Sequence, residues 1–156
     1  MRVHVLERKQ WLPIPLSEAW AFFSAPRNLG RITPPEMRFG NDPNLADVPV
    51  HEGERLTFTV RPLFGIAVGW RSLITAVDPP NRFVDKQLKG PFALWEHTHT
   101  FQPENEGTVV HDHLRYAMPL GMFGELVHAL LVRKRVEAIF AYRQEALARL
   151  FPSKAR

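Results

Sequence analysis

The sequence predicts an α+β domain in which a curved antiparallel sheet of about seven strands wraps around a long C-terminal helix. The middle of the chain alternates apolar and polar residues, as at residues 56–60, which is typical of half-buried strands. Residues 122–151 contain no proline and repeat apolar side chains at spacings of three and four, which is typical of a helix with one apolar face. The only large apolar surface available to that helix is the sheet, so the two layers are expected to share a core.

The N-terminal part predicts one strand and two short helices. The strand covers residues 3–12 and ends at a Pro-Ile-Pro run, because proline cannot donate to a ladder. Ser17 is a suitable N-cap for a helix over residues 18–23. A second short helix is expected over residues 28–32, since the two prolines that follow disfavour helical backbone before them.

The remaining strands form a meander that is punctuated by turn residues. Asp, Pro, Asn and Gly separate the apolar runs, and they fit tight connections between antiparallel strands. The expected strands cover residues 56–60, 67–77, 82–89, 92–101 and 108–118. From residue 122 the long helix is expected to continue to about residue 151, with Phe123, Leu126, Leu130 and Leu131 among its apolar positions.

Composition excludes several classes of protein. The chain has 156 residues, which suits a single domain over residues 1–156, and no cysteine, which excludes disulfides and thiolate metal sites. No apolar run approaches the ~20 residues that cross a bilayer, and the charged N-terminus lacks a secretory signal, so we expect a cytoplasmic protein. The net charge of +4 is not gathered into a basic stripe, so we expect no nucleic-acid partner.

The hairpin of the last two strands is predicted to carry polar residues on its inward face. Alternate residues of each arm share a face, and the aromatic and aliphatic set marks the inward one. If Phe101 pairs with Val110, the antiparallel register places His99 opposite Asp112. The inward residues, in pairs across the two arms, are Phe101 with Val110, His99 with Asp112, His97 with Leu114 and Trp95 with Tyr116.

A carboxylate inside a core needs a partner, so Asp112 is expected to pair with His99 and to raise its pKa. One interpretation is a buried network that fixes strand register. The other is a His99–Asp112 dyad that hydrogen-bonds a ligand or acts as a general base. His97, His99 and Asp112 also carry donor atoms that suit zinc, but we expect no resident metal and no cofactor. Parity does not decide whether Asp85 and Gln87 on the neighbouring strand face the cavity.

Other residues have two interpretations each. Trp70 lies in the middle of a strand, either in the core or as a platform for a ligand. Arg143 lies one turn after Phe140, where a buried salt bridge is favoured over a ligand clamp. The sequence has no Gly-rich phosphate loop, nucleophile elbow or HExxH motif, which disfavours nucleotide, phosphoryl and acyl-enzyme chemistry.

Several short motifs occur in an order that is typical of one superfamily. They are Asn28-Leu29, Ile32-Thr33-Pro34-Pro35, Asp78-Pro79-Pro80, Arg82-Phe83-Val84-Asp85, Gly90-Pro91-Phe92, the inward hairpin residues, Gly107-Thr108, Pro119, Phe140 and Arg143. With them the chain resembles the SRPBCC/START superfamily of helix-grip proteins, in particular its bacterial ligand-binding SRPBCC and polyketide cyclase/dehydrase-like branch. The resemblance implies a deep hydrophobic cavity between the sheet and the C-terminal helix, since members of the superfamily bind lipids, sterols, polyketides or quinones.

The leading hypothesis is that this cavity binds a small hydrophobic molecule of the lipid, polyketide, quinone or aromatic type. It requires a cavity of several hundred Å³. The alternative is a cyclase or dehydratase-type enzyme with His99 as base, Asp112 orienting it, and His97 or Tyr116 polarising a carbonyl. A third hypothesis is an adaptor that works through protein contacts, with a homodimer among its expected forms. The expected ligand contacts are Phe58, Trp70, Trp95, His97, His99, Asp112, Tyr116 and Phe140.

Overall fold

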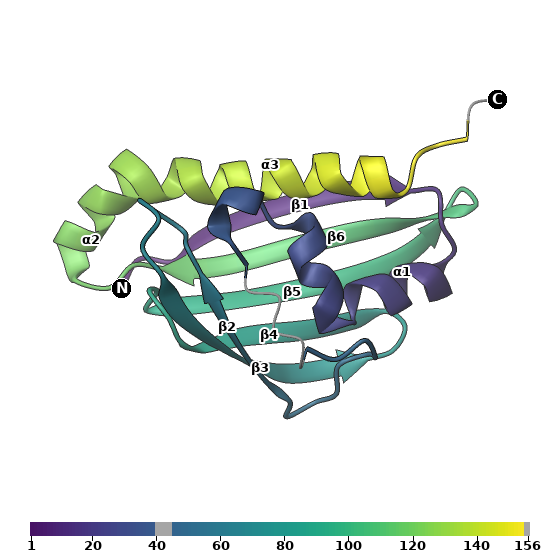
Figure 1. The fold of residues 1–156 in the computed structure, drawn as a ribbon, viewed down its shortest axis with the longest axis horizontal. Helices are drawn as coiled ribbons and strands as arrows, with labels where there is room; N and C mark the ends of the chain where they lie inside the picture. Colours follow the sequence, from purple (N-terminus) through teal and green to yellow (C-terminus); the bar gives the residue numbers. More distant parts are fainter. Residues whose placement is uncertain (40–44, 155–156) are drawn as a thin grey trace.

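A computed structural model of the chain describes residues 1–39 and 45–154. A single antiparallel sheet with the strand order β1-β6-β5-β4-β3-β2 curves around the helices (Figure 1). Its strands are β1 His4–Leu12, β2 Arg55–Val60, β3 Val68–Asp78, β4 Arg82–Lys89, β5 Leu94–Glu104 and β6 Gly107–Ala117. The α+β helix-grip class is therefore confirmed, with six strands in the described residues instead of about seven. The described stretch before β2, residues 45–54, is irregular, and Pro49 in it has no N–H to donate to a ladder.

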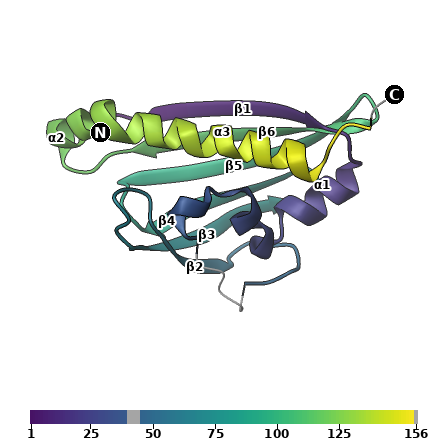
Figure 2. The same cartoon turned by 45° about the horizontal axis from the view of Figure 1, so that its top comes forward.

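The helices form two groups. The first follows β1 and consists of α1 Leu16–Phe23 and the 3₁₀-helices η1 Pro26–Ile32 and η2 Pro35–Met37. The second is a continuous C-terminal rod of α2 Gly121–Val127, the π-helical turn η3 His128–Val132 and α3 Arg133–Leu150. This C-terminal helix runs along the β1 and β6 side of the sheet (Figures 1 and 2).

The start of α1 differs from the prediction at one position. Its N-cap is Pro15, and no side chain caps the helix, so the expectation that Ser17 is the cap is wrong. The backbone N–H groups of Glu18 and Ala19 instead donate to the carbonyl oxygen of Pro15, at 3.0 and 3.1 Å. The fixed φ of proline, −67° here, already sets the extended backbone that an N-cap needs.

The β5–β6 hairpin has the register that the sequence predicts. Phe101 pairs with Val110 and His99 pairs with Asp112. The connection is two residues long, Asn105 and Glu106, and both have positive φ (48° and 61°). Such a turn matches the right-handed twist of the strands that it joins, so it fixes the register of the whole hairpin.

The core has two parts. The first includes Trp20, Phe83 and Phe101 and lies under α1 and the end of α3. The second includes Leu114 and Phe140 and lies under the middle of the C-terminal helix. Two histidines lie where these parts meet: the ring of His99 stacks on Phe83 with centroids 4.1 Å apart, and the ring of His97 meets Phe140 edge-on at 5.5 Å.

The buried face of the C-terminal helix is not the one that its apolar residues predict. Its buried positions follow at intervals of four, from Gly124 through His128, Val132 and Val136 to Phe140. An α-helix turns about 100° per residue, so such a series drifts by about 40° at each step. The π-helical turn has more residues per turn and reduces this drift. Four residues expected on the apolar stripe are therefore exposed: Phe123, Leu126, Leu130 and Leu131.

Candidate functional site

A group of ionisable side chains lies inside the fold, between the sheet and α3. The alternation of β5 and β6 places His97, His99 and Asp112 on the inward face, where each is less than 7 % exposed. Asp85 on β4 also faces inward, which the sequence left undecided, and Arg143 reaches the group from α3. Gln87 instead closes the turn after β4 by donating from Nε2 to the carbonyl oxygen of Phe92 at 2.8 Å.

The hydrogen bonds of this group run along the diagonals of the sheet. His97 Nε2 lies 2.8 Å from Asp112 Oδ1, and His99 Nε2 lies 2.8 Å from Asp85 Oδ2. The residues directly opposite in the register are His99 with Asp112 and Asp85 with His97. Diagonal neighbours have Cβ atoms roughly 7–8 Å apart in a sheet, which leaves room for an imidazole between backbone and carboxylate.

The expected His99–Asp112 pair is present as an ion pair that helps to raise the pKa of His99, but it is not hydrogen-bonded. His99 Nδ1 lies 3.5 Å from Asp112 Oδ1, which is an ion-pair distance without a hydrogen bond. Asp112 is held instead by His97 and by Arg143, whose Nη2 is 3.1 Å from Oδ1. The buried salt bridge that was favoured for Arg143 is thus confirmed.

Both carboxyl groups are ionised despite their burial. Burial alone raises the pKa of Asp112, but the charge of Arg143 and the hydrogen bond from His97 outweigh it and hold that pKa well below its usual range. Burial likewise raises the pKa of Asp85, and the hydrogen bond from His99 overcomes it, so the pKa of Asp85 is also lowered. Two negative charges therefore lie close together in the interior.

The pKa values of the two histidines are shifted in opposite directions. Burial and the neighbouring charge of His99 lower the pKa of His97. Burial also opposes protonation of His99, but its interactions with the carboxylates of Asp112 and Asp85 prevail and raise its pKa. The charge of Arg143 and the hydrogen bonds of the two rings thus offset the negative charges of the two aspartates.

An interior pocket adjoins this group on the side of α1 and η1. Its volume is about 80 Å³, well below the several hundred Å³ expected between sheet and helix. Phenylalanine side chains occupy the space, among them Phe22, Phe58 and Phe83. The pocket is lined by Phe22, Phe23, Ser24, Pro26, Asn28, Leu29, Ile32, Val50, Leu56, Phe58, Ser72, Ile74, Phe83, Asp85, His99 and Arg143.

Two buried nitrogen atoms belong to residues that line this pocket. Nδ1 of His99 and Nε of Arg143 have no hydrogen-bond partner among the described residues. Buried polar groups in proteins are nearly always paired, so each such atom calls for an explanation. The polar end of the pocket can therefore accept a group that carries a lone pair.

The structure does not bring the expected ligand contacts around one cavity. Only Phe58 and His99 of that set line the interior pocket. Trp70, Trp95 and Tyr116 form an aromatic cluster, in which Trp70 and Trp95 have ring centroids 5.2 Å apart and Trp95 and Tyr116 6.1 Å. The other expected contacts are buried in the core: His97, Asp112 and Phe140.

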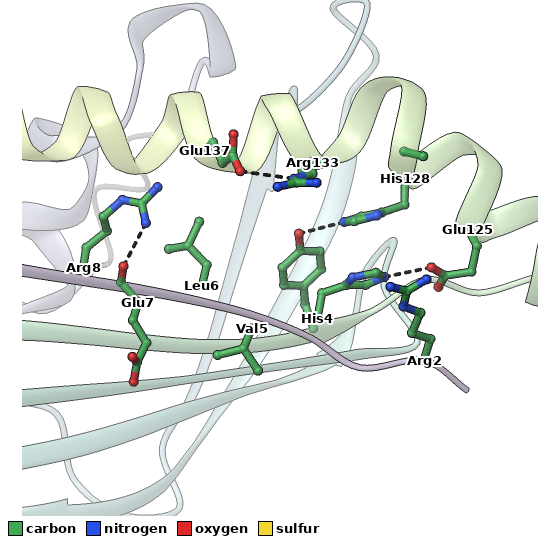
Figure 3. A pocket seen from close by; sticks show the side chains of 12 residues that line it. Arg2, His4, Val5, Leu6, Glu7, Arg8, Glu125, His128, Arg133 and Glu137 are labelled. Carbon is green, nitrogen blue, oxygen red and sulfur yellow. Dashed lines mark hydrogen bonds and ion pairs between the residues drawn. The ribbon is translucent and has the colours of Figure 1, made fainter.

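A second and larger pocket, of about 470 Å³, lies between β1 and the C-terminal helix (Figure 3). It is lined by Arg2, His4, Val5, Leu6, Glu7, Arg8, Tyr116, Glu125, His128, Ala129, Arg133 and Glu137. At one end His4 Nε2 lies 2.9 Å from Glu125 Oε2, and the Tyr116 hydroxyl lies 2.8 Å from His128 Nε2. Sequence reasoning missed this site, because no motif links His4 to residues more than a hundred positions later.

Comparison with known proteins places the chain in a family. The sequence model of a family described as a domain of unknown function (DUF8410) matches residues 14–151. The chain belongs to the DUF8410 family. No curated protein matches this DUF8410 chain.

Solved structures share the fold of this DUF8410 protein. A START superfamily protein from Mycobacterium smegmatis is 12% identical with a TM-score of 0.66, covering 94% of this chain and 99% of that one. Ginseng major latex-like protein 151 from Panax ginseng is 11% identical, with a TM-score of 0.67 and coverage of 97% and 99%. The protein TTHA0849 from Thermus thermophilus is 21% identical, with a TM-score of 0.63 and coverage of 94% and 99%. The resemblance to the SRPBCC/START superfamily is confirmed at the level of the fold.

A helix must be both long and apolar to cross a bilayer. Over residues 1–39 and 45–154, this DUF8410 protein has no helix that combines the two properties.

Proposed function

We propose that this protein binds a small apolar molecule with a neutral carbonyl or hydroxyl group in the interior pocket beside His99. The observation that carries the proposal is the pair of buried nitrogen atoms without a hydrogen bond, His99 Nδ1 and the donor Arg143 Nε, on residues that line a largely apolar pocket. An unpaired buried donor costs roughly 1–3 kcal/mol, and a ligand oxygen at this position would recover part of that cost.

The charge of the surroundings favours a neutral ligand group over a carboxylate. Arg143 and the hydrogen bonds of the two histidines already offset the charges of Asp85 and Asp112, and the pKa values of both carboxyl groups are lowered. A ligand carboxylate would add an uncompensated charge in a buried place, which is costly. Among the expected ligand types, quinones and polyketides therefore suit the pocket better than fatty acids.

The size of the pocket implies that it widens when a ligand enters. Its 80 Å³ is well below the roughly 300–1,000 Å³ of typical ligand sites. Phe22 and Phe23 on α1 and Leu29 and Ile32 on η1 form the wall opposite the sheet. Those elements lie outside the ladder of strands, so an outward shift of α1 and η1 makes room without breaking strand pairing.

Native mass spectrometry of freshly purified protein, followed by calorimetric titration with menadione and with decanoate, tests the proposal. We expect menadione to bind and decanoate to bind at least about tenfold more weakly. Leu29→Trp, which fills the pocket, should abolish menadione binding, whereas Leu130→Trp on an exposed helix position should not. Failure of menadione and of any co-purifying molecule to bind, or equal binding by Leu29→Trp, would refute the proposal.

An enzymatic role is the second candidate, because His99 lines the same pocket. Burial lowers the pKa of His99, but the Asp112 and Asp85 carboxylates outweigh burial and raise it. A histidine with a raised pKa suits the role of proton donor better than that of the general base first expected. In a cyclase or dehydratase-type reaction His99 would protonate a carbonyl or leaving oxygen. His99→Gln should then retain ligand binding and lose turnover, and unchanged turnover would end this candidate.

Two further expectations remain proposals. A cytoplasmic location is supported by the absence of cysteine from the sequence. A homodimer is supported by the exposed side chains of Phe123, Leu126 and Leu130 on one segment of the C-terminal helix. Light scattering of the purified protein and of Leu126→Glu checks it: a monomeric wild type would contradict the homodimer.

A further inference from the structure

We propose that His4, Glu125 and His128 form a binding site for a divalent transition-metal ion, Zn²⁺ by preference, at one end of the 470 Å³ pocket between β1 and the C-terminal helix (Figure 3). The site is separate from the interior pocket, so it stands or falls independently of the proposed ligand-binding function. It also departs from the expectation of a metal-free protein, which rested on sequence spacing alone.

The donor atoms are already gathered. One ligand atom from each of the three residues lies within 4.8 Å of the others, and His4 Nε2 is 2.9 Å from Glu125 Oε2. Zinc holds nitrogen and oxygen ligands at about 2.0–2.2 Å, so two ligands in a tetrahedral site lie roughly 3.4 Å apart. Shifts of about 1 Å or less therefore bring the three atoms around one ion.

Three separate elements hold these ligands in place. His4 is the first residue of β1, Glu125 lies on α2, and His128 opens the π-helical turn η3. The π-helical turn keeps His128 on the inward face of the C-terminal helix, and such turns occur often at functional sites. The Tyr116 hydroxyl is 2.8 Å from His128 Nε2 and fixes its ring, which is the role of the outer partners of metal-bound histidines.

The exposure of the residues suits a metal. The side chains of His4 and Glu125 are 15% and 27% exposed, which leaves an ion a path from solvent. The two imidazoles stack with centroids 3.7 Å apart, and an ion bound between their edges and Glu125 would hold both neutral.

The composition of the ligand set leaves a position open. Two histidines and one glutamate are a common set for zinc, with water or a ligand in the fourth position. Arg2 and Arg133 line the same pocket, and they favour an anionic group at that position. They also reduce the affinity for the cation itself, an effect that Glu7 and Glu137 on the same pocket oppose.

The interior group Asp85, His97 and His99 offers similar donor atoms and is the natural competitor. It is the poorer site for two reasons. Arg143 lies 3.1 Å from the adjoining Asp112, so a fixed cation already occupies the group. His97 and His99 are each only 6% exposed, so an ion has less access to them from solvent than to His4 and Glu125. The proposal therefore predicts one tight ion per chain.

The test is a titration of chelator-treated protein with Zn²⁺ by calorimetry and with Co²⁺ by visible absorption. The wild type should bind one equivalent, with the d–d bands of a low-coordinate nitrogen and oxygen site for Co²⁺. Glu125→Gln and His4→Ala should each weaken binding at least about 100-fold. Glu125→Gln is nearly isosteric at a half-buried position, so its fold should survive, and circular dichroism checks this for both variants.

His51→Ala is the matched control. His51 Nδ1 lies 3.2 Å from Glu54 Oε2, so this pair has the same chemistry as His4 and Glu125, but it is exposed and belongs to neither triad of candidate ligands among the described residues. The control should bind Zn²⁺ as tightly as the wild type. Absence of stoichiometric binding to the wild type, unchanged binding by folded Glu125→Gln and His4→Ala, or loss of binding in Asp85→Asn instead would overturn the proposal.

Discussion

Asp112 is a buried carboxylate whose charge is met by the guanidinium group of Arg143 and by a hydrogen bond from His97. Arg143 supplies the one permanent positive charge of the group, at 3.1 Å and on a different element of the fold. The sheet and α3 are therefore joined by an ion pair in which each side chain is about as buried as the other (8% and 7% exposed). Removing one partner of such a pair is costly because the other charge stays behind.

Arg143→Met is expected to lower the free energy of unfolding by about 3–5 kcal/mol, since it leaves Asp112 buried without its cation. Urea denaturation followed by circular dichroism measures this change. Arg133→Met is the control: its ion pair with Glu137 is 68% and 47% exposed, and such pairs contribute about 0–1 kcal/mol. Equal effects of the two variants would contradict the assigned role of Arg143.

The two buried histidines should give opposite dependences of stability on pH. The pKa of His99 is raised from its usual 6.5, because its carboxylate partners outweigh burial. Its contribution is complete below the unfolded-state pKa and is lost as the pH rises through the folded-state pKa. The wild type should therefore lose stability relative to His99→Gln as the pH rises above the usual histidine pKa of 6.5, as measured by urea denaturation at each pH.

His97 should behave in the reverse sense. Burial and the charge of His99 lower its pKa below the usual 6.5. As the pH falls below 6.5, His97 becomes protonated in the unfolded chain but stays neutral in the folded protein down to a lower pH. The wild type should therefore lose stability relative to His97→Gln in acid. NMR titration of the two rings is a direct check, and a higher pKa for His97 than for His99 would contradict both assignments.

The C-terminal helix shows why residue type alone is a poor guide to a long helix. Four leucine and phenylalanine positions of its first half are exposed, while a glycine and a histidine face inward. The difference comes from the π-helical turn η3, which changes the phase between α2 and α3. An argument from periodicity assumes that the number of residues per turn is constant along the helix. No sequence pattern predicts the larger number of residues per turn in η3. The extent of the helix was predictable, but its buried face was not.

Substitutions in this helix should follow the observed face and not the apolar pattern. Leu130→Gln should change the free energy of unfolding by less than about 0.5 kcal/mol, because its side chain is exposed. Phe140→Ala should cost about 3–5 kcal/mol, because it leaves a cavity in the core against His97. Thermal and urea denaturation distinguish the two, and a large effect of Leu130→Gln would show that this residue is covered.

The N-terminal end of the C-terminal helix packs closely against the chain just before it, at Gly124. A Cβ atom on Gly124 would overlap the carbonyl oxygen of Pro119, whereas one on Gly69 in β3 would meet open space. Gly124→Ala should therefore lower stability by about 1–3 kcal/mol, as overpacking does, and Gly69→Ala should be neutral or slightly stabilising. Denaturation curves that coincide for the two variants would show that the end of β6 and α2 separate at little cost.

The register of the β5–β6 hairpin could be predicted from the sequence, but its side-chain hydrogen bonds could not. Alternation and turn length predicted which residues of β5 and β6 face inward and which pair, and the structure agrees. The actual hydrogen bonds follow the diagonals and involve Asp85 on a third strand. Side-chain length and the neighbouring strand decide this, and neither enters an argument from parity.

For the molecule as a whole, the order of elements was enough to predict the helix-grip fold, but not the state of its interior. Six strands and one long helix enclose a space that side chains from α1, β2 and β4 largely fill. The remaining interior volume is about 80 Å³, against about 470 Å³ for the pocket beside β1. Cavity volume is set by how side chains far apart in the sequence interlock, which no local pattern records. The fold therefore constrains where a ligand can enter more firmly than how large it is.

The closeness of His4 to Glu125 and His128 has a practical outcome for anyone purifying this protein. An affinity tag of consecutive histidines attached before Met1 would hang beside those side chains, and it would supply imidazoles to the same place. The last turn of α3, at Leu150, lies at the opposite end of the C-terminal helix from α2 (Figure 1). A removable tag at that end keeps the added histidines away from His4. The metal content of the purified protein should therefore be assayed with the tag at that end.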